Sequence, residues 1–259
     1  MSQTWSRSWT LVLLALVLTL AGACSDAITE TTRPDSPSFQ RTTGKIAVNR
    51  ALVAQYARAH WNRAYGTGST HNPFCNYEKE GGNCANFASQ AIMAALVGST
   101  DPRTVINRRR EFQIDRDPRY KASYQWYFES CQDKGPAWGG AHKLYEYAKY
   151  NKPTYKSLHF QLVTYDTPTK FMDYKLVQPG DIIFMDVENN GHFDHTMIVV
   201  AYNSTSVFKR GYDRVRVAYQ NAIGLPSVGD RGLGEINEAY KFKAVFHVYR
   251  PIDYSYEGQ

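Results

Sequence analysis

One cysteine of this chain combines the residue type and the position that suit covalent catalysis. Cys84 follows two glycines and an asparagine and opens the segment 84–96, which has no Gly or Pro and has helically spaced apolar residues. We therefore expect Cys84 at a helix N-terminus, where free backbone N–H groups and the helix dipole favour the thiolate over the thiol. A thiolate in that position is a candidate nucleophile.

A nucleophilic cysteine needs a general base within hydrogen-bond reach and a third group that orients this base. His195 is the best candidate for the base, because it begins the apolar segment 195–200. Gln220 and Asn221 follow the next predicted strand, and an amide oxygen that accepts the imidazole N–H would fix the tautomer. The residues alone do not decide between the two amides. They also leave open a structural thiol at Cys84 and a histidine at position 195 that is satisfied by the backbone.

The elements that must position these residues are predicted as helices followed by strands. Apolar spacing indicates helices over 46–64, 84–97 and 138–150. Strand signals follow in the second half of the chain, over 181–185, 196–202, 214–219 and 242–249. Helices first and antiparallel strands second are typical of an α+β domain.

The N-terminal residues predict that the protein is exported. Residues 11–20 are almost entirely apolar, a run that is too short to span a bilayer and typical of the core of a signal peptide. A small-residue cleavage site ends at Ala23, so Cys24 would become the first mature residue. Cys24 is then either lipidated, as in bacterial lipoproteins, or the free N-terminus of a secreted protein.

A flexible tether is expected between Cys24 and the functional domain. Residues 25–43 are rich in Ser, Thr and Pro and poor in large apolar residues, a composition typical of linkers. We therefore predict a signal peptide over 1–23, a tether over 24–44 and one functional domain over 45–252. The expected location is the cell envelope, as a membrane lipoprotein or as a secreted protein.

The two remaining cysteines are consistent with a protein that is exported to the cell envelope. The chain has four cysteines, and once Cys24 and Cys84 are given roles, Cys75 and Cys131 remain. An even pair in an oxidising compartment predicts a disulfide, with two buried thiols as the alternative. A zinc site on Cys75 and Cys84 is less favoured, because their spacing is wide and no closely spaced cysteine pair follows.

Charge and composition exclude other classes of function. The formal net charge of +6, from 30 Lys and Arg against 24 Asp and Glu, favours contact with anionic polymers. No dense basic block with interleaved aromatic residues occurs, so we expect no nucleic-acid partner. The basic triplet 108–110 is either part of a solvated loop or a lip that steers an anionic cell-wall polymer.

Two apparent metal motifs fail on their chemistry. Residues 186–191 begin like an EF-hand calcium loop, but Met197 occupies the twelfth position, where a bidentate Glu is required. His192, Asp194 and His195 lie so close together beside one strand that they do not all point the same way. We therefore expect no metal and no cofactor.

Several motifs along the chain together resemble one known family. They are, in order, Asn49-Arg50, Gly81–Gln90, Trp126-Tyr127, Pro136–Trp138, Pro179–Ile183 and Asp194–Val199. Over about residues 45–250 they resemble the bacterial "putative amidase domain" family, whose cysteine motif reads roughly Gly-Gly-Asp-Cys-Thr-Asn-Phe-Val-Ser-Gln. That family is similar to papain-fold cysteine hydrolases of the NlpC/P60 and CHAP types.

The resemblance implies a papain-like α+β fold in which N-terminal helices pack on an antiparallel sheet. It also implies that Cys84 is the nucleophile and His195 the general base. This chain departs from the family at Asn83, where an Asp is usual, and at Gln220 and Asn221, where the family often has a His. With an amide in place of this His, the role of orienting His195 falls to the side chain of Gln220 or Asn221.

These expectations together predict hydrolysis of an amide bond in cell-wall peptide, with peptidoglycan as the partner. We expect a monomeric cysteine amidase or peptidase that is attached to the membrane through a lipidated Cys24. The alternative from another class is a cell-wall-binding domain of the same fold that has lost turnover. A third is an acyl transferase that uses the same residues and passes the acyl group to an amine.

Overall fold

The structure of the protein is a computed structural model that describes most of the predicted domain. The described segments are residues 44–65, 71–80, 82–112, 125–150, 157–167, 170–203, 214–220, 227–241 and 243–256. The predicted signal peptide, Cys24 and the tether up to residue 43 lie outside these segments, as does Asn221. Within them, no helix is both long and apolar enough to cross a membrane.

Most helices of the described segments precede the main run of strands. They are α1 (Arg50–His60), α2 (Cys84–Val97), α3 (Pro102–Arg108), α4 (Pro136–Gly139), α5 (Ala141–Tyr150) and α6 (Leu233–Ala239), with 3-10 turns η1 (Glu78–Glu80), η2 (Arg109–Phe112) and η4 (Tyr174–Leu176). The predicted Cys84 helix is α2, which ends at Gly98, whose φ of 77° is a left-handed conformation that favours glycine. The predicted helix 46–64 starts later, because Asn49 caps α1 by accepting the backbone N–H of Leu52.

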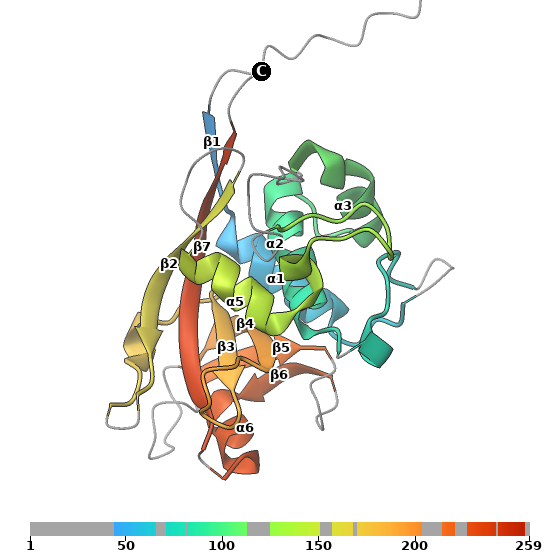
Figure 1. The fold of residues 1–259 in the computed structure, drawn as a ribbon. Coiled ribbons are helices and arrows are strands. Elements are labelled where there is room, and N and C mark those ends of the chain that lie inside the picture. The colour runs from blue at the N-terminus through green and yellow to red at the C-terminus, as the bar shows by residue number, and fades with distance from the viewer. Residues whose placement is uncertain are drawn as a thin grey trace, which may run out of the picture. The chain divides into compact units, whose positions relative to one another are not determined.

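The seven strands of the described segments form one antiparallel sheet. Figure 1 shows its arrangement. They are β1 (Gly44–Ala47), β2 (Ser157–Tyr165), β3 (Ile182–Asp186), β4 (His195–Tyr202), β5 (Val215–Tyr219), β6 (Val228–Gly232) and β7 (Val245–Tyr256). The order in the sheet is β1, β7, β3, β4, β5, β6, and β2 pairs with β7. Strands β3, β4 and β5 match the sequence prediction. The predicted strand 242–249 begins later and continues to Tyr256 as β7, and β1, β2 and β6 are additional.

Two hydrophobic clusters cover the two faces of the sheet. The first contains residues of α1 to α5 together with Ile198 and Val200 of β4. The second contains Met197 and Val199 of β4 together with Leu233 and its neighbours in α6. Every residue of α2 is buried, so α2 is the central helix of the first face. The predicted α+β class, with helices packed on an antiparallel sheet, is therefore confirmed.

Candidate active site

Cys84 is the first residue of α2 and lies against the beginning of β4. The backbone N–H groups of Cys84 itself, Ala85 and Thr196 hydrogen-bond the thiol. The side chain is buried, with only 4% of the residue exposed. The helix start thus supplies the N–H donors that the sequence predicts, and Thr196 adds a donor from the sheet.

The surroundings of Cys84 favour the thiol over the thiolate. Burial raises the pKa of Cys84 to about 11, because removal from water outweighs the three backbone N–H donors that lower it. The negative charge of Asp194 adds to the increase. This corrects the expectation that the helix start favours the thiolate: the N-terminal donors are present, but desolvation dominates.

His195 begins β4, as predicted, and is almost completely buried. Its imidazole lies edge-on to the ring of Tyr219, with the ring centroids 4.7 Å apart. Neither ring nitrogen has a hydrogen-bond partner within the described segments. Burial lowers the pKa of His195 to about 3, so the imidazole is neutral at physiological pH.

The Cys84 thiol contacts the backbone of β4 next to His195, but the side chains of Cys84 and His195 are not hydrogen-bonded to each other. The amide that contacts the thiol belongs to Thr196, the residue after His195. Alternate residues of β4 point to the same face of the sheet, so the side chain of His195 lies on the same side as Met197 and Val199. Its ring therefore faces the cluster that contains α6. The structure therefore brings the backbone of β4 to the thiol, but the ring of His195 lies on the opposite side of the sheet from α2, and the predicted thiol–imidazole hydrogen bond is not formed.

Gln220 is held by residues other than His195. Its side-chain NH2 group donates to the carbonyl oxygen of His60 at 2.8 Å, and its side-chain oxygen accepts the hydroxyl of Tyr65. Because successive strand residues point to opposite faces, Gln220 is directed toward α1, away from the ring of His195. The structure does not pair these two residues, and the other predicted amide, Asn221, lies outside the described segments.

Tyr65 is a polar neighbour of Cys84 that no sequence motif indicates. Its hydroxyl donates to Gln220 and accepts from the amide of Gln90 at 3.5 Å. Burial raises the pKa of Tyr65, and negative charge on Cys84 raises it further. This buried network ties the chain before α2 to the end of β5. Tyr65 lies in a stretch of sequence without a periodic pattern, so only the tertiary structure reveals its position.

The polar residues of the cysteine motif hold α2 against the aromatic core. The side-chain oxygen of Asn86 accepts the indole N–H of Trp138 at 2.8 Å. The hydroxyl of Ser89 accepts the indole N–H of Trp126 at 2.9 Å and donates to the carbonyl oxygen of Trp138. Buried polar groups are satisfied in this way in stable cores. These motif residues therefore position the helix that carries Cys84.

Two links hold the loop that precedes Cys84. A disulfide joins Cys75 to Cys131, with their Cα atoms 5.5 Å apart, which confirms the predicted pairing. The side-chain oxygen of Asn83 accepts the backbone N–H of Tyr77 at 2.8 Å, and its NH2 group donates to Asn76 at 2.6 Å. An ionised aspartate could accept but not donate, so the amide at position 83 suits this loop.

A cavity of about 410 Å³ opens beside the start of α2. Its wall is polar and aromatic and contains Trp61, Asn62, Arg63, Ala64, Tyr65, Asn76, Glu78, Asn83, Gln220 and Ser227. The wall reaches the residue before Cys84 and both partners of the Tyr65–Gln220 hydrogen bond. A substrate that approaches the thiol from this side would first meet these groups.

The segment 186–191, which resembles the start of a calcium loop, forms a turn that is held by hydrogen bonds within the protein. Asp186 accepts the backbone N–H groups of Asn190 and Gly191, at 3.2 and 2.7 Å, and so closes the turn between β3 and β4. Across the described part of the chain, no group of three His, Cys, Asp or Glu side chains is arranged to hold a metal ion.

The basic triplet is engaged with acidic residues near η2. Arg108 pairs with Glu111 at 2.7 Å and Arg110 pairs with Glu129 at 3.1 Å. The triplet lies at the end of α3 and in η2, so the predicted loop is wrong. Its charges have partners within the domain, which does not favour a lip that waits for an anionic polymer. Both ion pairs lie at the surface, so they contribute little to stability.

Comparison with known proteins places the chain in a family. The sequence pattern of the family described as "Putative amidase domain" matches residues 47–227, which is more than half of the chain and includes Cys84, His195 and Gln220. The chain belongs to this family. Membership in the putative amidase domain family supports hydrolysis of an amide bond as the general activity. No curated protein and no solved structure matched the chain in the same comparison.

Proposed function

We propose that the protein is an exported cysteine amidase or peptidase that hydrolyses an amide bond in cell-wall peptide. One observation carries the proposal: the Cys84 thiol lies at the start of a buried helix, hydrogen-bonded to the backbone beside His195, in a member of an amidase family. Such a helix start offers both a nucleophile and backbone N–H donors for the oxyanion that forms in amide hydrolysis.

In the proposed reaction, His195 takes the proton of the Cys84 thiol while the sulfur attacks the carbonyl carbon of the substrate. The C–N bond then breaks, the imidazolium gives its proton to the leaving amine, and the acyl group stays on the sulfur as a thioester. Water attacks the thioester with His195 as the base, which releases the carboxylic acid and restores the thiol. The resting pair is neutral, because burial raises the pKa of Cys84 and lowers that of His195.

The first step requires the start of β4 to rearrange, because the ring of His195 faces the side of the sheet opposite to α2. Neither ring nitrogen is hydrogen-bonded within the described segments, so this movement breaks no hydrogen bond of the ring and gives up its contact with Tyr219. We assign the orientation of the turned ring to the amide of Asn221, since the amide of Gln220 is engaged elsewhere. A side-chain amide suffices for this role, as in Cys-His-Asn hydrolases.

The same arrangement supports kinship with papain-like cysteine hydrolases. The cysteine begins a central helix, and the histidine begins a strand of the antiparallel sheet on which that helix packs. In the chain, most helices precede the sheet, in the order that the resemblance to NlpC/P60 and CHAP enzymes implies.

Export and the cell-wall substrate belong to the proposal as well. The disulfide between Cys75 and Cys131 supports export, because such bonds persist in oxidising compartments. A signal peptide over 1–23 and a lipidated Cys24 would hold the domain at the membrane side of the wall. The positive net charge suits an anionic wall polymer.

One observation favours a second candidate, a cell-wall-binding domain without turnover. The pKa of Cys84 is raised and the imidazole of His195 points away from it, which is also what a structural thiol beside a buried histidine would show. The reactivity of the resting thiol does not separate the two candidates, because a high pKa fits both. They differ in whether products form.

Digestion of purified peptidoglycan separates the candidates. We expect the wild-type protein to release fragments with new amine and carboxylate ends, identified by mass, and Cys84→Ala to release none while it still sediments with the wall. Wild-type protein that binds without releasing fragments would support the binding domain. Release of the same fragments by Cys84→Ala would overturn the cysteine mechanism, and incorporation of an added primary amine would indicate acyl transfer.

A further inference from the structure

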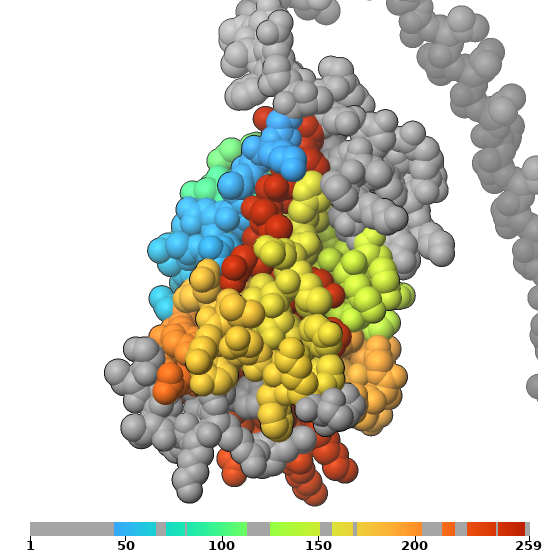
Figure 2. Space-filling view, turned by 90° about the vertical axis from the view of Figure 1, so that its left-hand side faces the viewer, coloured from blue at the N-terminus to red at the C-terminus, as the bar shows by residue number. Residues whose placement is uncertain are grey.

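The turn between β3 and β4 leads directly into the candidate site. It comprises residues 187–194 and is followed by His195 and then by Thr196, whose backbone N–H bonds the Cys84 thiol. Figure 2 shows this turn (light orange) below α5 (yellow-green) at one edge of the surface. The contacts that hold the turn against α5 therefore also position the start of β4.

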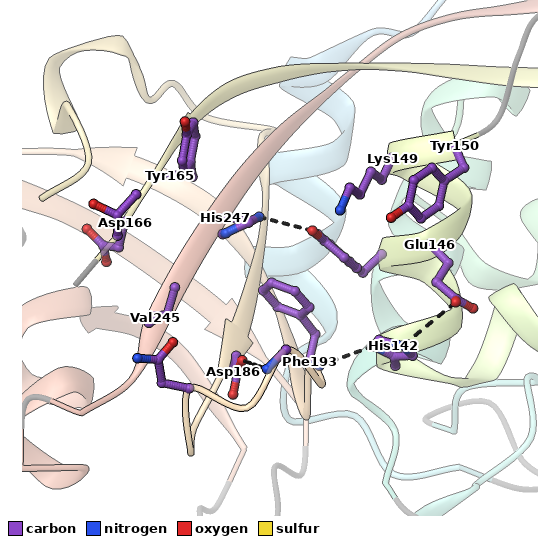
Figure 3. A pocket seen from close by; sticks show the side chains of 14 residues that line it. His142, Glu146, Lys149, Tyr150, Tyr165, Asp166, Asp186, Phe193, Val245 and His247 are labelled. Atoms are coloured by element: carbon purple, nitrogen blue, oxygen red, sulfur yellow. Dashed lines mark hydrogen bonds and ion pairs between the residues drawn. The ribbon is translucent and has the colours of Figure 1, made fainter. Parts of the chain in front are cut away.

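Phe193 joins the turn to α5 in two ways. Its buried ring stacks on Tyr145, with the ring centroids 3.8 Å apart. Its backbone N–H donates to Nδ1 of His142 at 3.2 Å, a bond that Figure 3 shows as a dashed line. The ring contact does not depend on charge, whereas the hydrogen bond requires an acceptor at Nδ1.

This hydrogen bond exists only while the imidazole of His142 is neutral. A neutral imidazole has one nitrogen that accepts, and here it is Nδ1, so the proton of the ring is on Nε2. Nε2 lies 3.8 Å from the carboxylate of Glu146, one turn further along α5. A protonated imidazole has two N–H groups and no acceptor, so it would direct an N–H at the N–H of Phe193.

A second histidine lies against His142. The ring of His192 stacks on that of His142, with the centroids 4.4 Å apart and an angle of 16° between the planes. Nδ1 of His192 lies 3.3 Å from the carboxylate of Asp194, at the end of the turn. Like charges at such a distance repel each other, so protonation of both rings pushes the turn away from α5.

The charged groups around His142 oppose one another. Burial has the largest effect on its pKa and lowers it below the usual value, and the charges of His192 and Lys143 lower it further. Glu146 and Asp186 act in the opposite direction, but Glu146 is paired with Lys143 at 2.7 Å and Asp186 accepts two backbone N–H groups of the turn. Further charged or titratable side chains on the elements around this contact are Tyr145, Lys149, Glu188, Asp194 and His247. The folded protein therefore binds a proton at His142 only at a pH below about 6.5.

We propose that His142 is a positioning residue that holds the start of β4 through the backbone of Phe193 while its imidazole is neutral and loosens it when the imidazole is protonated. Because the ring of Phe193 stays packed on Tyr145, protonation loosens the turn without unfolding the sheet. The contact stands on its own geometry. Its effect on catalysis rests on the proposed function, in which the start of β4 must rearrange before His195 can reach Cys84.

Amide hydrogen exchange of the full chain, followed by NMR, tests the contact without turnover. The protection factor of the Phe193 amide, corrected for the intrinsic pH dependence of exchange, should fall about tenfold between pH 7 and pH 5, as the loss of one hydrogen bond provides. The amide of Gly191 is the internal control, because it donates to the carboxylate of Asp186 at 2.7 Å in the same turn. The nitrogen chemical shifts of His142 should show the Nε2–H tautomer at pH 7.

Two substitutions separate the proton from the hydrogen bond. His142→Asn offers an amide oxygen close to the place of Nδ1 and does not titrate, so the Phe193 amide should stay protected at both pH values. His142→Ala should leave this amide unprotected at both. A wild-type protection factor that does not change with pH would overturn the proposal, and so would an equal decrease in His142→Asn with unchanged circular dichroism. The wild-type measurement decides alone where a variant fails to fold.

Turnover gives a second readout. Under the proposed function, wild-type hydrolysis should rise by up to about tenfold from pH 7 to pH 5, because burial lowers the pKa of His195 to about 3 and this ring remains a base. His142→Asn should lack the rise. Loosening of the turn in an inactive enzyme would keep this role of His142 and reject the amidase function, and hydrolysis without any loosening would do the reverse.

Discussion

The backbone N–H of Thr196 hydrogen-bonds the thiol of Cys84 and so ties the proposed nucleophile to the strand that carries the proposed base. This bond joins the start of α2 to the start of β4, two elements that lie far apart in the chain. The same contact buries the sulfur, and burial raises the pKa of Cys84 to about 11. The result is a thiol that is positioned in advance and becomes reactive when a base reaches it.

Replacement of His195 is expected to abolish activity as fully as replacement of Cys84. The two residues transfer one proton between them, so loss of either should lower kcat/KM by roughly three orders of magnitude or more. His192→Ala is the matched control, because its ring is exposed and stacks on His142 with centroids 4.4 Å apart. Initial rates of amide hydrolysis measure both variants. A larger loss in His192→Ala would move the general base to that residue.

Alkylation of Cys84 should be slow at neutral pH and should accelerate as the pH rises toward 11. The thiolate is the reacting species, and a raised pKa lowers its fraction at pH 7. We expect a rate with iodoacetamide on the order of a hundredfold below that of a free cysteine peptide. Mass analysis of the peptide that contains Cys84 provides the measurement. A rate above that of the free peptide at pH 7 would show a depressed pKa instead.

Acid is expected to destabilise the fold partly through His195. Burial lowers its pKa from 6.5 to about 3, so between these pH values the unfolded chain binds more protons than the folded one. This contribution to stability is complete above pH 6.5 and is lost as the pH falls toward 3. His195→Leu should therefore show a smaller decrease in Tm between pH 7 and pH 4 than the wild type. His60 and His247, whose pKa values are also lowered, stay the same in both proteins, so equal decreases would contradict the assignment.

Gln220 and Asn221 are expected to affect different properties. Gln220→Ala leaves the buried groups of Tyr65 and His60 with one partner fewer, which should cost about 1–3 kcal/mol of unfolding free energy. Asn221→Ala should reduce kcat and leave the stability almost unchanged. Denaturant unfolding and steady-state kinetics distinguish the two effects. If Gln220→Ala lowers kcat in a stable protein while Asn221→Ala is active, Gln220 is the orienting residue.

The sequence predicts those elements whose own pattern decides their structure. Helix α2 follows from an apolar run without breakers that ends at Gly98, and β3 follows from the turn at Pro179 and Gly180. Strand β2 carries polar residues and two irregularities in its pairing with β7, so its alternation is weak and the long partner strand decides its structure. Its existence is a tertiary effect, which no local pattern could reveal.

The same division holds for the candidate site. The position of Cys84 at a helix start and of His195 at a strand start follow from local sequence. The direction of the pKa shift of Cys84 does not, because the depth of burial depends on how α2 packs on β4. The partners of Gln220 likewise come from α1 and from Tyr65, which pack beside it only in the folded domain.

The central claim is that Cys84 carries the acyl group during turnover. The most direct measurement is mass spectrometry of the protein after acid quenching during hydrolysis of a cell-wall peptide, with the modified residue located by digestion. The account predicts an added mass equal to the acyl fragment on the peptide that contains Cys84, and its absence in Cys84→Ala. Turnover without this adduct, at a rate that Cys84→Ala retains, would contradict it.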